Sequence, residues 1–245
     1  MIRRLAPLLL AGVLLATGCG GDDDTTAERP PLGSPPDPGP APDDDGLSDG
    51  QRETFAESTV RISGVACGRN TEGSGFVVAD DLIATNAHVV LGLPRPTIGL
   101  IDGETVEGEV VAFDAIDDLA LVRVADLGLE PLPLGTADDG TVGAVFGWEE
   151  GPRVDPTPFR IDRPVTVRIE AVASDERIER RSWLVAAEIE AGDSGAALVD
   201  RSGRVVGVAY ATTTRGSSVA YAVRAMRLEA LIDAGFNANL TIPDC

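Results

Sequence analysis

Short runs of hydrophobic and β-branched residues, separated by glycine, aspartate and proline, recur through most of the chain after residue 54. We predict strands at residues 59–65, 75–79, 82–85, 105–113, 119–124, 142–146, 165–173, 183–189, 196–199, 205–212 and 218–223. Short strands at such spacing, with turn residues between them, are typical of β-sandwiches and β-barrels. The pattern therefore predicts an all-β fold.

A helical period is found only near the end, at residues 224–234, where Ala225, Leu228 and Ile232 fall on one face. The sequence lacks the alternation of helices and strands that would indicate a parallel sheet, and it has no internal repeat. We therefore predict one all-β domain at residues 54–245, with a C-terminal helix packed on it.

The N-terminal residues have the pattern of a signal peptide. Arg3 and Arg4 precede an uncharged run at residues 5–17, and small residues lead from there to Cys19. The run has 13 residues, fewer than the roughly 20 that a membrane-spanning helix needs. We predict that residues 1–18 are cleaved and that the protein is extracytoplasmic.

The sequence Ala16-Thr17-Gly18-Cys19 resembles a bacterial lipobox, although leucine is more common than Ala16 at the first position. This resemblance implies that Cys19 becomes the lipidated N-terminus and anchors the protein in the cell membrane. An ordinary secretory signal cut nearby, or a weak membrane anchor, is the alternative. Residues 19–53 are rich in proline, aspartate and glycine, which predicts a disordered, extended tether.

Composition and charge exclude several classes of function. The chain has 245 residues, 43% of them hydrophobic, and a formal net charge of −20. This charge argues against a nucleic-acid partner. All basic residues are arginine, so lysine-dependent mechanisms are excluded. One histidine and three cysteines are too few for a typical zinc site, and we expect no metal and no cofactor.

Three motifs follow one another along the predicted domain. They are GSGFVV with LIATNAHVV at residues 73–78 and 82–90, FDAIDDLALVRV at 113–124, and EAGDSGAALV at 190–199. Together they resemble the motifs of chymotrypsin-fold (trypsin-like) serine proteases, in the chain order His, Asp, Ser. The TNAHVV form is most similar to the bacterial HtrA group and to actinobacterial membrane-tethered acid-resistance proteases. The resemblance implies two six-stranded antiparallel Greek-key barrels, and we expect no PDZ domain after them.

A serine nucleophile needs a base whose pKa lies near neutrality, and His88 is the only imidazole of the chain. The base in turn needs a carboxylate on its other ring nitrogen. Asp114, Asp117 and Asp118 compete for that role, and Asp118 is favoured because it directly precedes a predicted strand. The resemblance makes Ser194 the nucleophile.

The backbone N–H groups of Gly192 and Ser194 are the expected oxyanion hole. Asp193 is unusual, because HtrA-like enzymes carry asparagine there, whereas digestive proteases neutralise such an aspartate with a free N-terminus. We expect that the tether is cut near residues 54–60, or that Asp193 finds another partner or stays solvated. A further departure is Ala196-Ala197 where the family usually has Gly-Pro.

The resemblance assigns the specificity pocket to residues that include Glu188 and Thr212. A carboxylate at the base of the pocket would favour Arg or Lys before the cleaved bond. In the alternative, the strand register differs by one residue and Glu188 or Glu190 faces solvent.

Cys67 and Cys245 remain once Cys19 is lipidated, and an oxidising compartment permits a disulfide between them. Two free thiols are the alternative. The sequence as a whole predicts a lipid-anchored serine endopeptidase whose partners are the membrane and polypeptide substrates, and which works through an acyl-enzyme intermediate. The alternatives are a peptide-binding pseudoprotease with weak activity and a purely structural lipoprotein.

Overall fold

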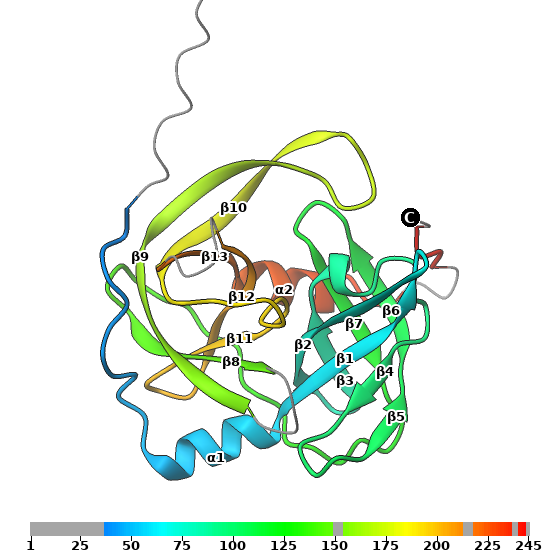
Figure 1. Ribbon diagram of the computed structural model, residues 1–245, viewed down its shortest axis with the longest axis horizontal. Helices are drawn as coiled ribbons and strands as arrows, with labels where there is room; N and C mark the ends of the chain where they lie inside the picture. Colours follow the sequence, from blue (N-terminus) through cyan, green and yellow to red (C-terminus); the bar gives the residue numbers. More distant parts are fainter. Residues whose placement is uncertain (1–36, 149–153, 213–217, 237–239, 244–245) are drawn as a thin grey trace, which may run out of the picture. The chain divides into compact units, whose positions relative to one another are not determined.

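Antiparallel strands form most of the folded chain (Figure 1), as the sequence predicts. We analysed a computed structural model, which describes residues 37–148, 154–212, 218–236 and 240–243. All of these belong to one compact unit, Pro35–Cys245. The predicted signal peptide and Cys19 lie outside the described residues.

The first half of this unit is a curved sheet. In chain order it contains β1 (Thr59–Ala66), β2 (Arg69–Ala79), β3 (Leu82–Thr85), β4 (Thr97–Gly99), β5 (Thr105–Glu107), β6 (Glu109–Asp114) and β7 (Leu119–Arg123). Their spatial order among the described residues is β5-β4-β1-β2-β3-β7-β6. The 3-10 turn η1 (Ala87–Val89) follows β3.

The second half is a closed barrel. Its strands are β8 (Val142–Trp148), β9 (Val154–Glu170), β10 (Arg177–Ala186), β11 (Ala197–Asp200), β12 (Val205–Thr212) and β13 (Val219–Arg224). They close in the order β10-β13-β12-β11-β8-β9. The expectation of a six-stranded barrel is therefore confirmed for this half.

The first sheet differs from that expectation, because seven strands are present in its described residues and its two edges are not joined by a regular ladder. The N–H groups of Gly108 and Val110 donate to the carbonyls of Pro96 and Pro94, at 2.9 and 3.0 Å. Proline has no N–H and cannot donate a hydrogen bond back to this segment. The carbonyls ahead of β4 therefore accept hydrogen bonds from the start of β6, but the two segments do not form a regular strand pair.

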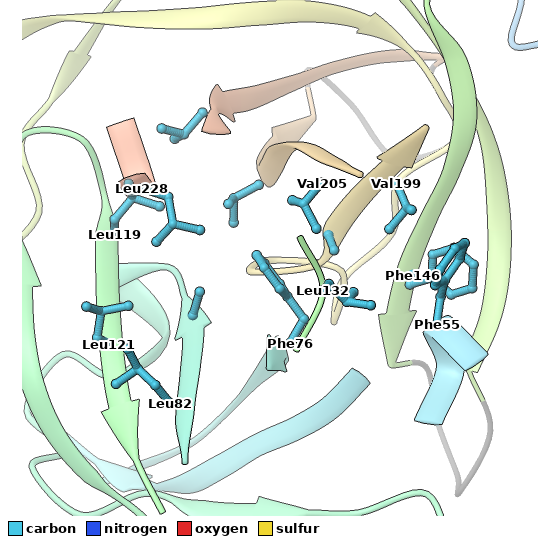
Figure 2. Close-up of a cluster of buried hydrophobic side chains, with 14 of the residues drawn as sticks. Phe55, Phe76, Leu82, Leu119, Leu121, Leu132, Phe146, Val199, Val205 and Leu228 are labelled. Carbon is cyan, nitrogen blue, oxygen red and sulfur yellow. The ribbon is translucent and has the colours of Figure 1, made fainter. Parts of the chain in front are cut away.

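Side chains from both halves share one core, which keeps the two sheets together (Figure 2). In β7, Leu119 and Leu121 face this shared core, whereas Ala120 and Val122 face the separate core of the first sheet. Successive strand residues point to opposite faces, so a continuous apolar run serves both cores. Phe76 of β2 belongs to this shared core together with residues of the second barrel such as Val199 and Val205.

The folded domain includes residues that the sequence assigned to the tether. The expected tether is wrong for residues 37–53, because helix α1 (Asp49–Glu57) starts within it and residues 37–48 lie against the second barrel (Figure 1). Ser48 and Gln51 form a reciprocal capping box at the start of the helix. Phe55 then packs edge-on against Phe146, with ring centroids 5.5 Å apart.

Residues 37–48 are fixed to the barrel by polar contacts as well. Arg160 Nη2 donates to the carbonyl of Pro38 at 2.7 Å, and Arg201 Nε donates to the carbonyl of Asp45 at 3.1 Å. Burial acts to raise the pKa of the Asp45 carboxyl, but hydrogen bonds from Arg52 and from the Leu47 N–H hold this pKa below its usual value. Asp45 is therefore charged and part of the folded domain.

The C-terminal segment connects the two halves. Helix α2 (Ala225–Asp233) confirms the predicted helix to within one residue at each end, and it buries Leu228 in the shared core. Leu240 and Ile242 pack against the core of the first sheet, and Gly92 N–H donates to the carbonyl of Pro243 at 3.2 Å. None of the helices in the described ranges has the length and hydrophobicity to span a membrane.

Candidate active site

His88 lies on the one-turn helix η1, directly after β3. Its neighbours Ala87 and Val89 are buried and anchor the turn, while the imidazole keeps 38% of its surface exposed. The buried Asn86 side chain donates from Nδ2 to the carbonyl of Asp118 at 2.8 Å. Buried apolar neighbours and this hydrogen bond therefore tie the histidine turn to the turn that follows β6.

Asp118 faces His88 from the turn between β6 and β7. Its carboxylate accepts the backbone N–H of His88 at 2.9 Å and lies 2.9 Å from the imidazole Nδ1. Only 4% of its side-chain surface is exposed. The backbone of Asp118 has φ of 56°, a left-handed conformation that aspartate tolerates better than most residues. This turn is what aims the carboxylate at the imidazole.

The other two acids of this loop have different partners. The Asp114 carboxylate accepts the backbone N–H groups of Ile116 and Asp117 at 2.9 and 3.0 Å, which closes the turn. Asp117 accepts a hydrogen bond from Arg227 Nε of α2 at 2.6 Å. The geometry thus distinguishes the three candidates: Asp118 contacts His88, and the described contacts of Asp114 and Asp117 are structural.

Ser194 is half-buried in the loop between β10 and β11, which packs against β2. Its carbonyl accepts the N–H of Ser74 at 2.8 Å. A Cβ on Gly73 would lie 2.9 Å from this carbonyl and 2.7 Å from a methyl group of Val89. Gly73 is therefore the point where the serine loop and the histidine turn approach each other, and the absence of a side chain permits this approach.

The hydroxyl of Ser194 forms no hydrogen bond with His88 in the part of the chain that the structure describes. Contacts of this kind are often long in free enzymes and shorten when substrate binds. The structure therefore brings His88 and Asp118 into direct contact. It holds the Ser194 loop close to the histidine turn, but without a hydrogen bond between the Ser194 hydroxyl and His88.

Ser74 holds the loop that carries the predicted oxyanion hole. Its buried hydroxyl donates to the carbonyl of Gly192 and accepts the N–H of Trp148, both at 2.7 Å. With its carbonyl engaged, Gly192 has φ of 111°, which glycine adopts readily. Among the described residues, the N–H groups of Gly192 and Ser194 donate to no acceptor, so both remain available to a ligand oxygen.

Asp193 is not solvated, which removes one of the three expectations for it. Asp193 is only 5% exposed, and its carboxylate accepts a hydrogen bond from the N–H of Glu190 at 2.9 Å. A Cβ on Gly147 would collide with this carboxylate, so β8 must carry glycine there. A buried carboxylate is stable only with such hydrogen bonds, and Asp193 therefore acts as a structural acid that shapes the serine loop.

The specificity pocket remains a prediction. Glu188 is exposed, as is Glu190, which agrees with the alternative that these carboxylates face solvent. The side chain of Thr212 lies outside the described residues. No cluster of three or more potential metal ligands is found where the structure is described.

Sequence reasoning identified the motifs but missed several residues that build the site. Ser74 and Asn86 lie inside the quoted motifs, yet their hydrogen bonds to Gly192 and Asp118 cross between segments. For Ser74 the sequence did contain a signal, because this serine lies between two glycines beside an apolar strand and can there form a hydrogen bond with a neighbouring backbone. Such a contact can be recognised only once the partner segment is known.

The structure has two antiparallel β-sheets that share a core. An Asp–His pair and a serine on a glycine-bounded turn lie beside the junction of the sheets. This combination is typical of the chymotrypsin-like class of folds. A family model described as "Trypsin-like peptidase domain" matches residues 73–208, which is more than half of the chain. The chain therefore belongs to the trypsin-like peptidase family.

Individual relatives agree with this assignment. The chain is 34% identical over 158 residues to serine protease Rv3671c of Mycobacterium tuberculosis, covering 62% of this chain and 40% of that protein. It is 33% identical over 156 residues to a probable periplasmic serine endoprotease, DegP-like, of Halomonas elongata, covering 60% and 31%. The chain thus spans less than half the length of these relatives.

Solved structures of the Rv3671c protease from M. tuberculosis share the fold. The active form superimposes with a TM-score of 0.76 at 27% identity, covering 84% of this chain and 92% of that one. The inactive form gives a TM-score of 0.67, covering 79% and 96%. The expected chymotrypsin-like fold is confirmed.

Proposed function

We propose that this protein is a serine endopeptidase that hydrolyses peptide bonds through Ser194, His88 and Asp118. The contact between the Asp118 carboxylate and His88 Nδ1, at 2.9 Å, carries the proposal. A carboxylate at this nitrogen fixes the tautomer that leaves Nε2 free to accept a proton, and it stabilises the imidazolium that results.

In this mechanism Ser194 Oγ attacks the carbonyl carbon of the substrate while His88 Nε2 takes the hydroxyl proton. The N–H groups of Gly192 and Ser194 donate to the developing oxyanion, which is usually a large part of the rate enhancement. His88 then gives its proton to the leaving amine, and an acyl-enzyme forms on Ser194. Water, activated by the same imidazole, releases the acid and restores the serine.

Two observations support activity in the free protein. Both N–H groups of the proposed oxyanion hole donate to no acceptor among the described residues. In addition, the chain resembles the active form of the Rv3671c protease more than its inactive form, with TM-scores of 0.76 and 0.67. One observation favours a second candidate, a peptide-binding pseudoprotease: Ser194 lacks a hydrogen bond to His88. Turnover of a peptide library by the wild-type protein separates the two, because a pseudoprotease binds peptides without cleaving them.

We also propose that the protein is extracytoplasmic and held at the membrane by a lipid on Cys19. The lipobox-like sequence before Cys19 and the similarity to a probable periplasmic endoprotease support this location. The mature wild-type protein is expected to begin at Cys19 and to carry the mass of a diacylglycerol there, and Cys19→Ala should lack this modification. A wild-type protein from the membrane fraction without lipid on Cys19 would contradict the lipid anchor.

We propose, third, that a disulfide joins Cys67 to Cys245, which itself lies outside the described residues. The nearby tail supports the pairing, because Leu240 and Ile242 pack on the first sheet, which carries Cys67 in the turn after β1. Such a bond would close a loop of about 180 residues and stabilise the fold by at most about 4 to 5 kcal/mol.

Reduction is therefore expected to lower both the melting temperature and the rate at which Ser194 reacts with a fluorophosphonate probe. The double variant Cys67→Ser, Cys245→Ser should reproduce both losses and should be insensitive to reductant. Intact-mass analysis of the unreduced protein is the direct check: two free thiols would contradict the disulfide.

A further inference from the structure

A buried arginine contacts the Asp118 carboxylate at Oδ2, the same oxygen that lies 2.9 Å from His88 Nδ1. Arg180 belongs to β10 and is only 1% exposed. The long β9–β10 hairpin of the second barrel carries it toward the first sheet (Figure 1), where Val172 N–H donates to the carbonyl of Ala115 at 3.1 Å. The hairpin thus contacts the same turn that contains Asp118.

The guanidinium of Arg180 contacts this turn at two points. Its Nε donates to the carbonyl of Ile116 at 2.8 Å, and its Nη1 lies 3.4 Å from Asp118 Oδ2. The group lies over the ring of Tyr210, 4.9 Å from the centroid. Its Nη2 is buried and has no partner in the described residues. A buried cation that satisfies only part of its hydrogen-bonding capacity is expensive, so this position calls for a role beyond stability.

In the part of the chain that the structure describes, the other groups next to this contact bring no further positive charge to Asp118. Burial raises the pKa of the Tyr210 phenol, which therefore stays neutral and shares a hydrogen bond of 2.8 Å with Ser182 Oγ. Asp117 and Arg227 pair with each other at the neighbouring position. Among the described residues, the side chains of positive or potentially positive charge that contact the Asp118 carboxylate are therefore His88 and Arg180, and both lie against Oδ2.

We propose that Arg180 is a positioning residue: it fixes the Asp118 carboxylate from the second barrel, so that this carboxylate keeps its orientation toward His88 Nδ1. The planar guanidinium can hold the Ile116 carbonyl and the carboxylate together, which an ammonium group cannot do in the same way. Arg180 also makes the geometry of the triad depend on docking of the β9–β10 hairpin. The inference rests on the proposed function, because it concerns the same triad.

The single histidine of the chain provides a test that does not require catalysis. In the full-length protein carrying Ser194→Ala, the Nδ1 proton of His88 is followed by NMR, where a hydrogen bond to a buried carboxylate gives a downfield, slowly exchanging signal. Adding Arg180→Met, which keeps an unbranched apolar stem, is expected to abolish or broaden this signal. Arg227→Met removes the neighbouring pair with Asp117 instead and should leave the signal in place.

The same substitutions are then made in the protein with Ser194 intact, and the rate of fluorophosphonate labelling is measured. Arg180→Met is expected to slow labelling roughly tenfold to a hundredfold, the size of effect that follows a displacement near 1 Å. Arg180→Lys should lie between Arg180→Met and wild type in both measurements. A merely structural arginine would lower the melting temperature without removing the Nδ1 proton signal from folded protein.

An unchanged Nδ1 proton signal in folded Arg180→Met overturns the proposal. If Arg180→Met does not fold, Arg180→Lys decides, and behaviour equal to wild type in both signal and labelling overturns it. Failure of the proposed function is recognised separately: the wild-type protein would then not label at all, while the NMR comparison would still report on the role of Arg180.

Discussion

Replacing Ser194 by alanine is expected to abolish hydrolysis of peptides and labelling by a fluorophosphonate probe. The hydroxyl is the proposed nucleophile, and removing the nucleophile of such a triad lowers kcat on the order of a millionfold. Labelling is read on a gel after incubation of wild type and variant at equal concentration. Stability should change little, because the Ser194 side chain is only half-buried and its described hydrogen bond is made by the backbone carbonyl.

Ser202 provides a matched control for this experiment. It is exposed in the turn between β11 and β12, where its hydroxyl contacts Asp200 at 2.7 Å. Ser202→Ala should therefore label as wild type does. Undiminished labelling of the Ser194→Ala variant would exclude Ser194 as the nucleophile, and loss of labelling in Ser202→Ala would indicate a nonspecific effect on folding.

Replacing Asp118 by asparagine should lower kcat about ten-thousandfold while the protein stays folded. Asparagine has nearly the same shape but can donate from its amide, so it favours the tautomer in which Nε2 carries the proton and cannot act as the base. It also removes the charge that stabilises the imidazolium. The measurement is kcat on a peptide substrate, together with the melting temperature.

Asp117→Asn is the control, because Asp117 is the next residue and also buried but bonds to Arg227 instead of His88. Its loss should reduce stability by weakening the contact between the β6–β7 turn and α2, with kcat changed by less than about tenfold. If Asp117→Asn lost activity as Asp118→Asn is expected to do, the assignment of the triad carboxylate would have to be exchanged between the two residues.

Much of the fold could be read from the sequence, because antiparallel strands have a strong local signature. The predicted bounds of β3 and β12 agree with the structure, and α2 begins and ends within one residue of its prediction. By contrast, α1 was missed inside a segment that looked like a tether. Its anchor is Phe55, which packs on Phe146 of the second barrel, and a contact between such distant residues leaves no local pattern.

The sequence by itself determined the candidates for the site: the only histidine, a serine between glycines, and three aspartates within five residues. Only the tertiary structure decided among the aspartates. A left-handed turn directs the Asp118 carboxylate toward His88, whereas the Asp117 carboxylate accepts a hydrogen bond from Arg227 of α2. Arg180 shows the same limit, since it lies in a run of charged residues, 175–181, that only Ile178 interrupts and that is typical of an exposed segment. It is buried because the hairpin folds over the first sheet, and burial of this kind depends on contacts between segments that are far apart in the chain.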